Sequence, residues 1–228
     1  MTRISVSLLA SLLPLLAPAA SAGDADYVPP RGADWARRSA EQAGFDPTRL
    51  QTAIDFAVAN ESREPRDLAL TIALTWSREP YDAIIGPTQP RGAPTGVILR
   101  GGYVIAQWGE PDRVDMTFSV TKSFLSTVTG IAFDRGLIKD VDGPVRLVLP
   151  ALFESEHNRD ITWSQLLRQT SNWRGTLWGK PDWGDRPTGD NPLAWPTLPV
   201  PAPGTAWEYN DVRVNLLALA ALHAWRKP

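Results

Sequence analysis

The sequence predicts a mixed α/β (α+β) protein, and three observations lead to this prediction. A β-hairpin pattern occupies residues 96–108, a helical pattern begins at residue 119, and another helical stretch covers residues 211–225. Of the 228 residues, 43% are hydrophobic and 21% are charged, which is typical of one large globular domain or two small ones. The net charge of −2 and the absence of a basic cluster argue against nucleic-acid binding.

The first 22 residues have the three parts of a secretory signal peptide. Arg3 supplies the positive charge, an apolar run follows, and Ala20-Ser21-Ala22 forms a small-residue cleavage site. We therefore expect cleavage after Ala22 and a periplasmic or secreted mature chain of residues 23–228. No later segment is apolar for long enough to span a membrane. The chain has no cysteine for disulfides, nucleophilic catalysis or thiolate metal ligands.

The stretch before the hairpin predicts one clear helix and one ambiguous segment. Asp46 and Pro47 fit the N-cap and the first position of a helix that runs to about Asn60. Residues 68–76 are apolar and are compatible with either a strand or a helix. Residues 86–94 contain three prolines and are expected to form a loop.

The hairpin is the clearest β-structure in the sequence. Residues 96–100 and 103–108 are two runs rich in strand-forming residues. Gly101-Gly102 joins them, and two-residue hairpin turns favour such a dipeptide because glycine tolerates positive φ angles.

The helix predicted from Ser119 has apolar residues at helical spacing, so we expect a buried stripe made of Val120, Phe124, Leu125, Val128 and Ile131. We expect Gly136 to end this helix, because glycine is the preferred residue just after the last helical turn. Thr162 and Gln165 form a capping-box pattern for a second, short helix. The stretch 171–205 is rich in tryptophan, proline and glycine without periodicity, and predicts a long functional loop.

The candidate chemistry lies at Ser119 and Lys122. Three residues apart on a helix, a hydroxyl and an amine share one face, and they can act as a nucleophile and its base. The alternative is that this serine and lysine lie on an exposed helical turn and have no catalytic role, since the Ser-x-x-Lys pattern alone is common. His157 and His223 are the only histidines, and their surroundings favour structural or solvent roles. We expect no metal and no cofactor, since no cluster of histidines or carboxylates has ligand spacing.

Several motifs in order resemble a known family. They are FSVTKSF at residues 118–124 after the hairpin, the connection 137–152, ITWSQLLRQTS at 161–171 and PGTAWEYND at 203–211. The chain resembles the β-lactamase and penicillin-binding-protein serine hydrolases from about residue 45 onward. The branch it resembles contains class C β-lactamases, D,D-peptidases, family VIII esterases and 6-aminohexanoate-dimer hydrolases. Gln169 stands where this branch usually has histidine.

The resemblance implies a fold and a set of catalytic residues. The fold is an antiparallel sheet flanked by helices plus an all-helical lobe, with residues 45–110 giving the first helix and hairpin and residues 111–228 most of the lobe. Ser119 would be the acylated nucleophile, Lys122 its activating partner, and Tyr209 the residue that moves protons. The backbone N–H of Ser119 would supply half of an oxyanion hole.

Asp211 departs from the family pattern, which has asparagine at this position. A carboxylate cannot donate to a substrate carbonyl as an amide can. We hypothesise that Asp211 pairs with Lys122, raises the pKa of the lysine and shifts the base role toward Tyr209.

The family's third motif, Lys/His-Ser/Thr-Gly on a strand, has no counterpart in the sequence, which stops at Pro228 shortly after Tyr209. We therefore expect an incomplete domain that lacks its C-terminal sheet strands. Such a chain, made alone, is expected to be poorly soluble and inactive because it exposes apolar surface.

The expected function is hydrolysis of an ester or amide through an acyl-enzyme. The partner would be a small-molecule ester, amide or β-lactam, or a cell-wall peptide, with Trp178 and Trp183 either lining its pocket or packing the helical lobe. Asp211 and the Trp-rich loop favour an esterase or amide hydrolase over a dedicated β-lactamase. The alternative is a non-catalytic module that binds cell-wall peptide.

Overall fold

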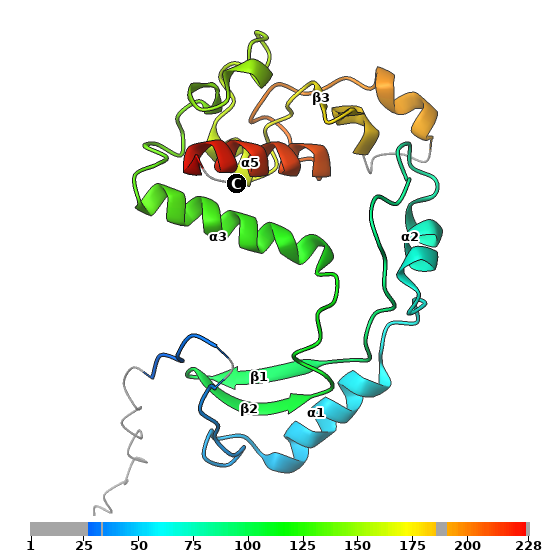
Figure 1. Cartoon of the computed structure of the whole chain (residues 1–228), viewed down its shortest axis with the longest axis vertical. Coiled ribbons are helices and arrows are strands. Elements are labelled where there is room, and N and C mark those ends of the chain that lie inside the picture. The colour runs from blue at the N-terminus through cyan, green and yellow to red at the C-terminus, as the bar shows by residue number, and fades with distance from the viewer. Residues whose placement is uncertain (1–26, 33, 186–190, 227–228) are drawn as a thin grey trace, which may run out of the picture. The chain divides into compact units, whose positions relative to one another are not determined.

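The computed structural model describes residues 27–32, 34–185 and 191–226. The expected signal peptide lies outside the described residues. The chain forms two compact units (Figure 1). Of the described residues, the first unit combines those up to Glu61 with Ala93–Asp112, and the second combines Ser62–Gly92 with those from Arg113 onward. Residues 62–92 lie in the second unit, together with the residues from Arg113 onward.

The first unit holds one helix, and its start is as predicted. Helix α1 (Pro47–Ala59) begins after Asp46, whose side chain accepts a hydrogen bond of 3.0 Å from the Arg49 N–H. Pro47 occupies the first turn, where its missing N–H costs nothing.

The first unit also holds the predicted hairpin, seen in Figure 1 as the two arrows beside α1. Strand β1 (Gly96–Arg100) pairs antiparallel with β2 (Tyr103–Trp108). Gly101 and Gly102 both have positive φ angles, 56° and 85°, so the turn uses the freedom that only glycine has at low cost. The register shifts between Ile98 and Leu99, a bulge that the alternation of residues did not reveal.

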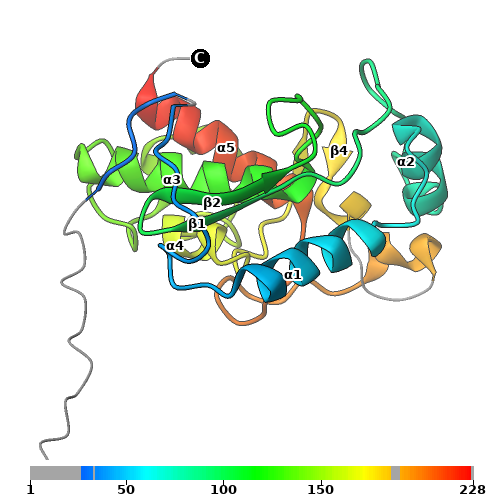
Figure 2. The same cartoon turned by 90° about the horizontal axis from the view of Figure 1, so that it is seen from below.

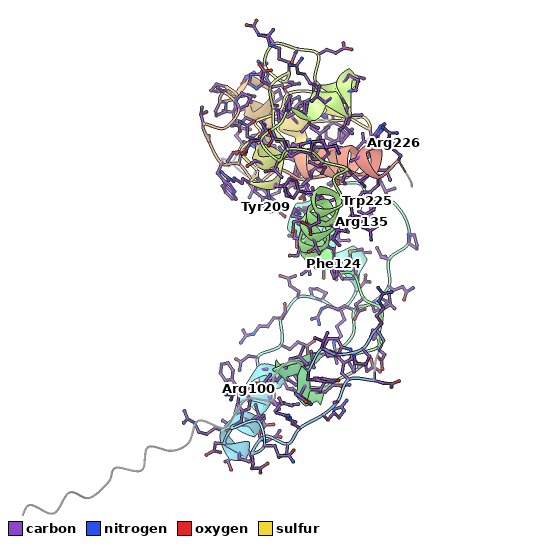
Figure 3. The ribbon with its side chains drawn as sticks, turned by 90° about the vertical axis from the view of Figure 1, so that its left-hand side faces the viewer. Arg100, Phe124, Arg135, Tyr209, Trp225 and Arg226 are labelled. Atoms are coloured by element: carbon purple, nitrogen blue, oxygen red, sulfur yellow. The ribbon has the colours of Figure 1, made fainter. Side chains whose placement is uncertain are left out.

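The second unit is built on two helices that lie side by side, α3 (Thr121–Asp134) and α5 (Asp211–Trp225) (Figures 1 and 2). Their C-terminal ends are joined by the Arg135 guanidinium, which lies 5.1 Å from the Trp225 ring centroid (Figure 3). The core of this unit includes residues of both helices and of the segments packed on them, namely Ala132, Ile138, Val145, Phe153, Ile161, Trp163, Leu166, Trp173 and Leu216.

Shorter elements complete the second unit. Helix α2 (Leu68–Trp76) settles the ambiguous segment as helical, with Asp67 as its N-cap. Helix α4 (Trp163–Leu167) has the complete predicted capping box between Thr162 and Gln165. The others are η1 (Phe118–Val120), η2 (Val145–Leu147), η3 (Pro150–Leu152), β3 (Thr176–Leu177), β4 (Lys180–Pro181), η4 (Asp182–Asp185) and η5 (Pro192–Thr197).

The prediction of a buried apolar stripe on the helix after Ser119 was wrong. Helix α3 starts at Thr121, and Thr129 and Ala132 are its buried residues. Helix α3 packs on α5 with the face that carries Thr129 and Ala132. Most of the predicted apolar stripe therefore points away from the core. Of the predicted stripe, Leu125 alone packs against the core of the described residues, whereas Val120, Phe124, Val128 and Ile131 are exposed. Amphipathic spacing identified the helix but not the face that it buries.

The fold class is confirmed as mixed α and β. The described residues contain two small antiparallel sheets of two strands each, β1–β2 and β3–β4, beside the helices. None of the helices in the described part of the chain is long and apolar enough to cross a membrane.

Candidate active site

Ser119 lies in η1, the short 3-10 turn that leads into α3. The residue before it, Phe118, has a φ angle of 46°, which is a costly backbone conformation for a bulky side chain. The chain thus turns sharply just before the hydroxyl, and Ser119 remains exposed at the start of the helix. Amide groups in the first turn of a helix have no intrahelical partner, so this position suits a developing oxyanion.

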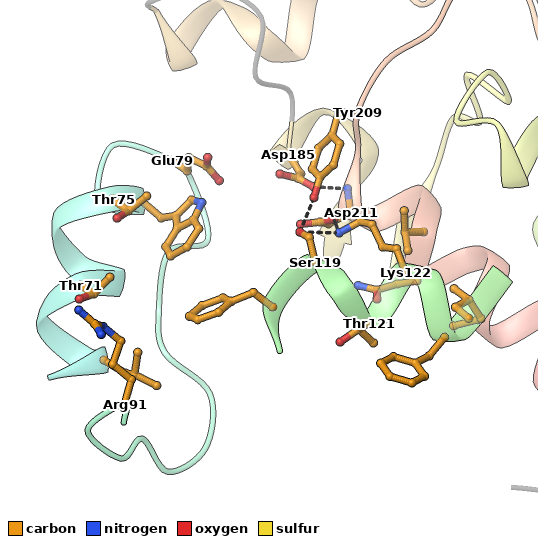
Figure 4. A pocket seen from close by; sticks show the side chains of 18 of the residues that line it. Thr71, Thr75, Glu79, Arg91, Ser119, Thr121, Lys122, Asp185, Tyr209 and Asp211 are labelled. Carbon is orange, nitrogen blue, oxygen red and sulfur yellow. Dashed lines mark hydrogen bonds and ion pairs between the residues drawn. The ribbon is translucent and has the colours of Figure 1, made fainter. Parts of the chain in front are cut away.

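The structure brings the three predicted catalytic side chains together. The Ser119 hydroxyl lies 2.7 Å from the Tyr209 hydroxyl, although the residues are 90 positions apart in sequence (Figure 4). Lys122 Nζ donates to Ser119 Oγ at 3.1 Å. The lysine ammonium also lies 4.8 Å from the centroid of the Tyr209 ring. A nucleophile therefore has both a proton acceptor and a cation within hydrogen-bonding distance.

Asp211 forms an ion pair with Lys122, as hypothesised from the sequence. The Asp211 Oδ1 atom lies 2.5 Å from Lys122 Nζ (Figure 4). Burial lowers the pKa of Lys122, but hydrogen bonds with Asp211 and Tyr209 and their charges outweigh it, so the pKa of the lysine is raised. Lys122 therefore carries a proton at neutral pH and is unsuited to be the base. Tyr209 is left as the group that can take the proton of Ser119.

A cavity of about 1130 Å³ opens over these residues, and all of its lining belongs to the second unit. Apolar side chains form one part of its wall, namely Leu68, Trp76, Phe118, Phe124, Leu125 and Val128. Trp76 and Phe118 stack with ring centroids 6.2 Å apart. Neither was singled out from the sequence, because α2 comes into contact with η1 only through the tertiary fold.

Three further carboxylates line the same cavity, those of Glu64, Glu79 and Asp185, and none of them was singled out from the sequence. Asp185, at the end of η4, accepts a hydrogen bond from the backbone N–H of Asp211. Burial, and then the charge of Asp211, raise the pKa of Asp185. Burial, followed by the charge of Asp185, likewise raises the pKa of Glu79. Carboxylates therefore outnumber cations in the lining of the cavity. Its two cations are Lys122, which is paired with Asp211, and Arg91.

Trp178 and Trp183 are not among the residues that line this cavity. Trp178 sits with Gly179 at the tip of the β3–β4 hairpin, where both have positive φ angles, and its side chain is 71% exposed. Trp183 packs on Tyr81 at a centroid distance of 6.0 Å and lines a separate, smaller cavity. The aromatic wall beside Ser119 is made by Trp76 and Phe118 instead.

The described residues contain no group of three or more histidine, aspartate or glutamate side chains placed to hold a metal ion. His157 hydrogen-bonds through Nε2 with the backbone carbonyl of Asn172 at 2.8 Å, which gives it a structural partner.

Comparison with known families agrees with this geometry. A model of the beta-lactamase family matches residues 83–224, a range that contains Ser119, Lys122, Tyr209 and Asp211. The chain belongs to the beta-lactamase family. Membership associates it in general terms with the serine hydrolases, without distinguishing a branch. No curated protein matches the chain.

Proposed function

We propose that this beta-lactamase-family protein is a serine hydrolase that forms an acyl-enzyme on Ser119 from an ester or amide. One observation carries the proposal: the Ser119 hydroxyl contacts both Tyr209 at 2.7 Å and Lys122 at 3.1 Å. A serine hydroxyl becomes a strong nucleophile only when a positioned group takes its proton. One of these partners lies on the helix that follows Ser119, and the other is 90 residues away in sequence and is brought to the serine by the fold.

In the first half of the reaction, Tyr209 acts as the general base. It accepts the proton of Ser119 Oγ while Oγ attacks the substrate carbonyl carbon and a tetrahedral oxyanion forms. The Lys122 ammonium, 3.1 Å from Oγ, stabilises the negative charge that develops there. Tyr209 then returns the proton to the leaving alcohol or amine as the carbonyl–leaving-group bond breaks.

In the second half, the same pair releases the acyl group. Tyr209 again acts as the general base and takes a proton from water as the water attacks the acyl carbonyl carbon. The proton passes to Ser119 Oγ as the ester bond to serine breaks, which restores the starting state. Each proton removed is thus returned, and neither a metal nor a cofactor enters the sequence of steps.

The charges in the cavity favour a neutral substrate over an anionic one. Asp185, Asp211 and Glu79 line the cavity, and the raised pKa values of Asp185 and Glu79 reflect burial and mutual repulsion. A substrate carboxylate placed beside them would add to that repulsion. The apolar wall with Trp76 and Phe118 suits a hydrophobic acyl group. We therefore propose a neutral ester or amide rather than an anionic β-lactam.

Two finer parts of the proposal rest on the sequence. The residues before Ala22 support export to the periplasm or secretion, and mass analysis of the mature N-terminus would test it. We also propose that this 228-residue chain turns over slowly or not at all when made alone. Exposed apolar side chains of η1 and α3, among them Val120 at 58% and Phe124 at 64%, support this because such surface promotes association.

Trapping of the acyl-enzyme tests the function separately from turnover. The purified protein is mixed with an activated neutral ester, quenched in acid and weighed as the intact chain. We expect the mass of one acyl group to be added, to vanish in Ser119→Ala, and to persist in Ser123→Ala, whose serine is exposed on the same helix. The rival reading, a module that binds cell-wall peptide, predicts peptide binding without any acyl adduct.

A further inference from the structure

Gln169 occupies an unusual backbone position next to the segment that carries Tyr209. It follows Arg168, the C-cap of α4, and has a φ angle of 56°. A left-handed conformation is uncommon for a residue other than glycine, and the surrounding structure must hold it in place. Its own N–H donates to the Leu166 carbonyl at 3.1 Å, so the left-handed turn ends the helix.

Gln169 contacts the backbone on both sides of Tyr209. The N–H of Glu208 donates to the main-chain carbonyl of Gln169 at 3.0 Å. The N–H of Asn210 donates to the side-chain Oε1 of Gln169, also at 3.0 Å. One residue thus accepts hydrogen bonds from the residue before the tyrosine and from the residue after it. The left-handed turn allows the carbonyl and the side chain to reach the same segment.

The rest of the segment is anchored from the other side. Asn210 is fully buried, and its Nδ2 donates to the carbonyls of Asp182 and Asp185 at 2.7 and 2.8 Å. Its Oδ1 accepts from the Arg213 N–H at 3.0 Å and caps α5. Without the Gln169 side chain, these bonds would still hold one end of the segment, but the Asn210 amide would lose its acceptor, while the Glu208 amide would keep the main-chain carbonyl.

The position of the tyrosine hydroxyl depends on this backbone. A tyrosine side chain has only two rotatable bonds, so a shift of the main chain moves its hydroxyl by a similar distance. The 2.7 Å contact with Ser119 leaves little tolerance. Misplacement of a reacting group by about 1 Å can lower a rate by about 100-fold.

We propose that Gln169 is a positioning residue for catalysis: by accepting from both amides that flank Tyr209, it holds the phenol within reach of the Ser119 hydroxyl. This inference rests on the proposed role of Tyr209 as the proton acceptor. It does not require Gln169 to touch the substrate, and Gln169 is not among the residues that line the cavity.

The test compares three variants of the purified protein. Gln169→Met keeps the length of the side chain but removes the acceptor, whereas Gln169→Glu keeps an acceptor at the same place. Gln51→Met makes the same change on α1, where the exposed glutamine donates a hydrogen bond to the exposed Asp55. The first readout is phosphonylation by a fluorophosphonate, separated into the maximal rate and the half-saturating concentration. The second is hydrogen exchange of the Glu208 and Asn210 amides.

We expect Gln169→Met to lower the maximal phosphonylation rate by about 10- to 100-fold with little change in half-saturation. Its Asn210 amide should exchange faster, and Gln169→Glu should restore both properties while Gln51→Met changes neither. Unaltered labelling and exchange in Gln169→Met would overturn the inference. If the unsubstituted protein is not labelled, the proposed function fails, and exchange at Asn210 still decides whether Gln169 holds the segment.

Discussion

Asp211 Oδ1 lies 2.5 Å from Lys122 Nζ, so the lysine beside the candidate nucleophile is bound in an ion pair. The pair raises the pKa of Lys122 although burial alone would lower it. A protonated lysine cannot take the serine proton, but it can stabilise charge on the oxygens near it. The ion pair therefore separates two roles within the site: Tyr209 transfers the proton, and Lys122 supplies a fixed positive charge.

Replacement of Asp211 should move the pH dependence of acylation. Asp211→Asn removes the negative charge and one of the two acceptor oxygens beside Lys122. Burial, which lowers the pKa of the lysine, is then opposed by weaker interactions, so this pKa falls. The lysine then loses its proton at lower pH, and the alkaline limb of the acylation-rate profile is expected to shift to lower pH. The measurement is the rate of fluorophosphonate labelling across the pH range.

The matched control for this change is Asp160→Asn. Asp160 forms an exposed ion pair with Arg146 at 3.7 Å and has no contact with the cavity. Its profile should overlay that of the unsubstituted protein. An unmoved profile in Asp211→Asn would show that the ion pair does not set the protonation state of Lys122.

Removal of the Tyr209 hydroxyl should slow acylation strongly. Tyr209→Phe keeps the ring but deletes the proton acceptor at 2.7 Å from Ser119 Oγ. We expect a loss of about 10²- to 10⁴-fold in the labelling rate, the range typical for a general base. Tyr81→Phe, in a tyrosine that packs on Trp183, is the control and should label normally. If Tyr209→Phe were labelled at a rate within twofold of the unsubstituted protein's rate, this tyrosine would be excluded as the base.

Substrate charge should matter because carboxylates line the cavity. With two activated esters of similar shape, the neutral one should acylate Ser119 about tenfold faster than the anionic one, which corresponds to about 1.4 kcal/mol of repulsion. The double change Glu79→Gln with Asp185→Asn should narrow the difference, and so should added salt. Equal rates for both esters in the unsubstituted protein would contradict the proposed preference.

Asp185 should also affect how stability varies with pH. Because its pKa is raised in the folded protein, the folded state holds this proton more tightly than the unfolded state does. The stability that Asp185 contributes is therefore lost as the pH rises from the ordinary pKa of an aspartate through the raised pKa of Asp185. Asp185→Asn, which can still accept from the Asp211 N–H, should raise the urea midpoint at pH 7 relative to the unsubstituted protein and make less difference near pH 3. The opposite trend would show that the carboxylate is stabilising when ionised.

Arg213 should be essential for stability in the second unit. It is 2% exposed, lies 2.5 Å from Glu208 and 3.6 Å from Asp182, and donates to the Trp173 carbonyl at 3.2 Å. Arg213→Met leaves two carboxylates without this cation and should cost about 3–5 kcal/mol of unfolding free energy. Denaturant unfolding measures it. Arg135→Met, which removes only a contact with Trp225, should cost about 1 kcal/mol or less.

The elements that depend on local chemistry were predictable from the sequence. Asp46 and Pro47 begin α1, Gly101-Gly102 makes the hairpin turn, and Thr162 with Gln165 caps α4, each within a few residues of its cause. Ser119 and Lys122 could be paired for the same reason, since helical spacing sets their proximity. The pairing of Asp211 with Lys122 was also hypothesised correctly, from a single departure in a motif.

The parts that depend on tertiary contacts were not predictable. Periodicity did not reveal that α3 would bury Thr129 and Ala132 while Phe124 stays exposed, because the face that packs is set by α5. Likewise, nothing local in the sequence brings Asp185 to Asp211 or Trp76 to Phe118. Those contacts appear only when separate segments meet around the cavity.

The most direct test of the account is to identify the residue that a fluorophosphonate modifies. The purified protein is labelled, digested and mapped by mass spectrometry, with Ser119→Ala and Ser123→Ala in parallel. The account predicts a single phosphonylated peptide containing Ser119, still modified at Ser119 in Ser123→Ala and lost in Ser119→Ala. No labelling, or labelling that persists in Ser119→Ala, would contradict it.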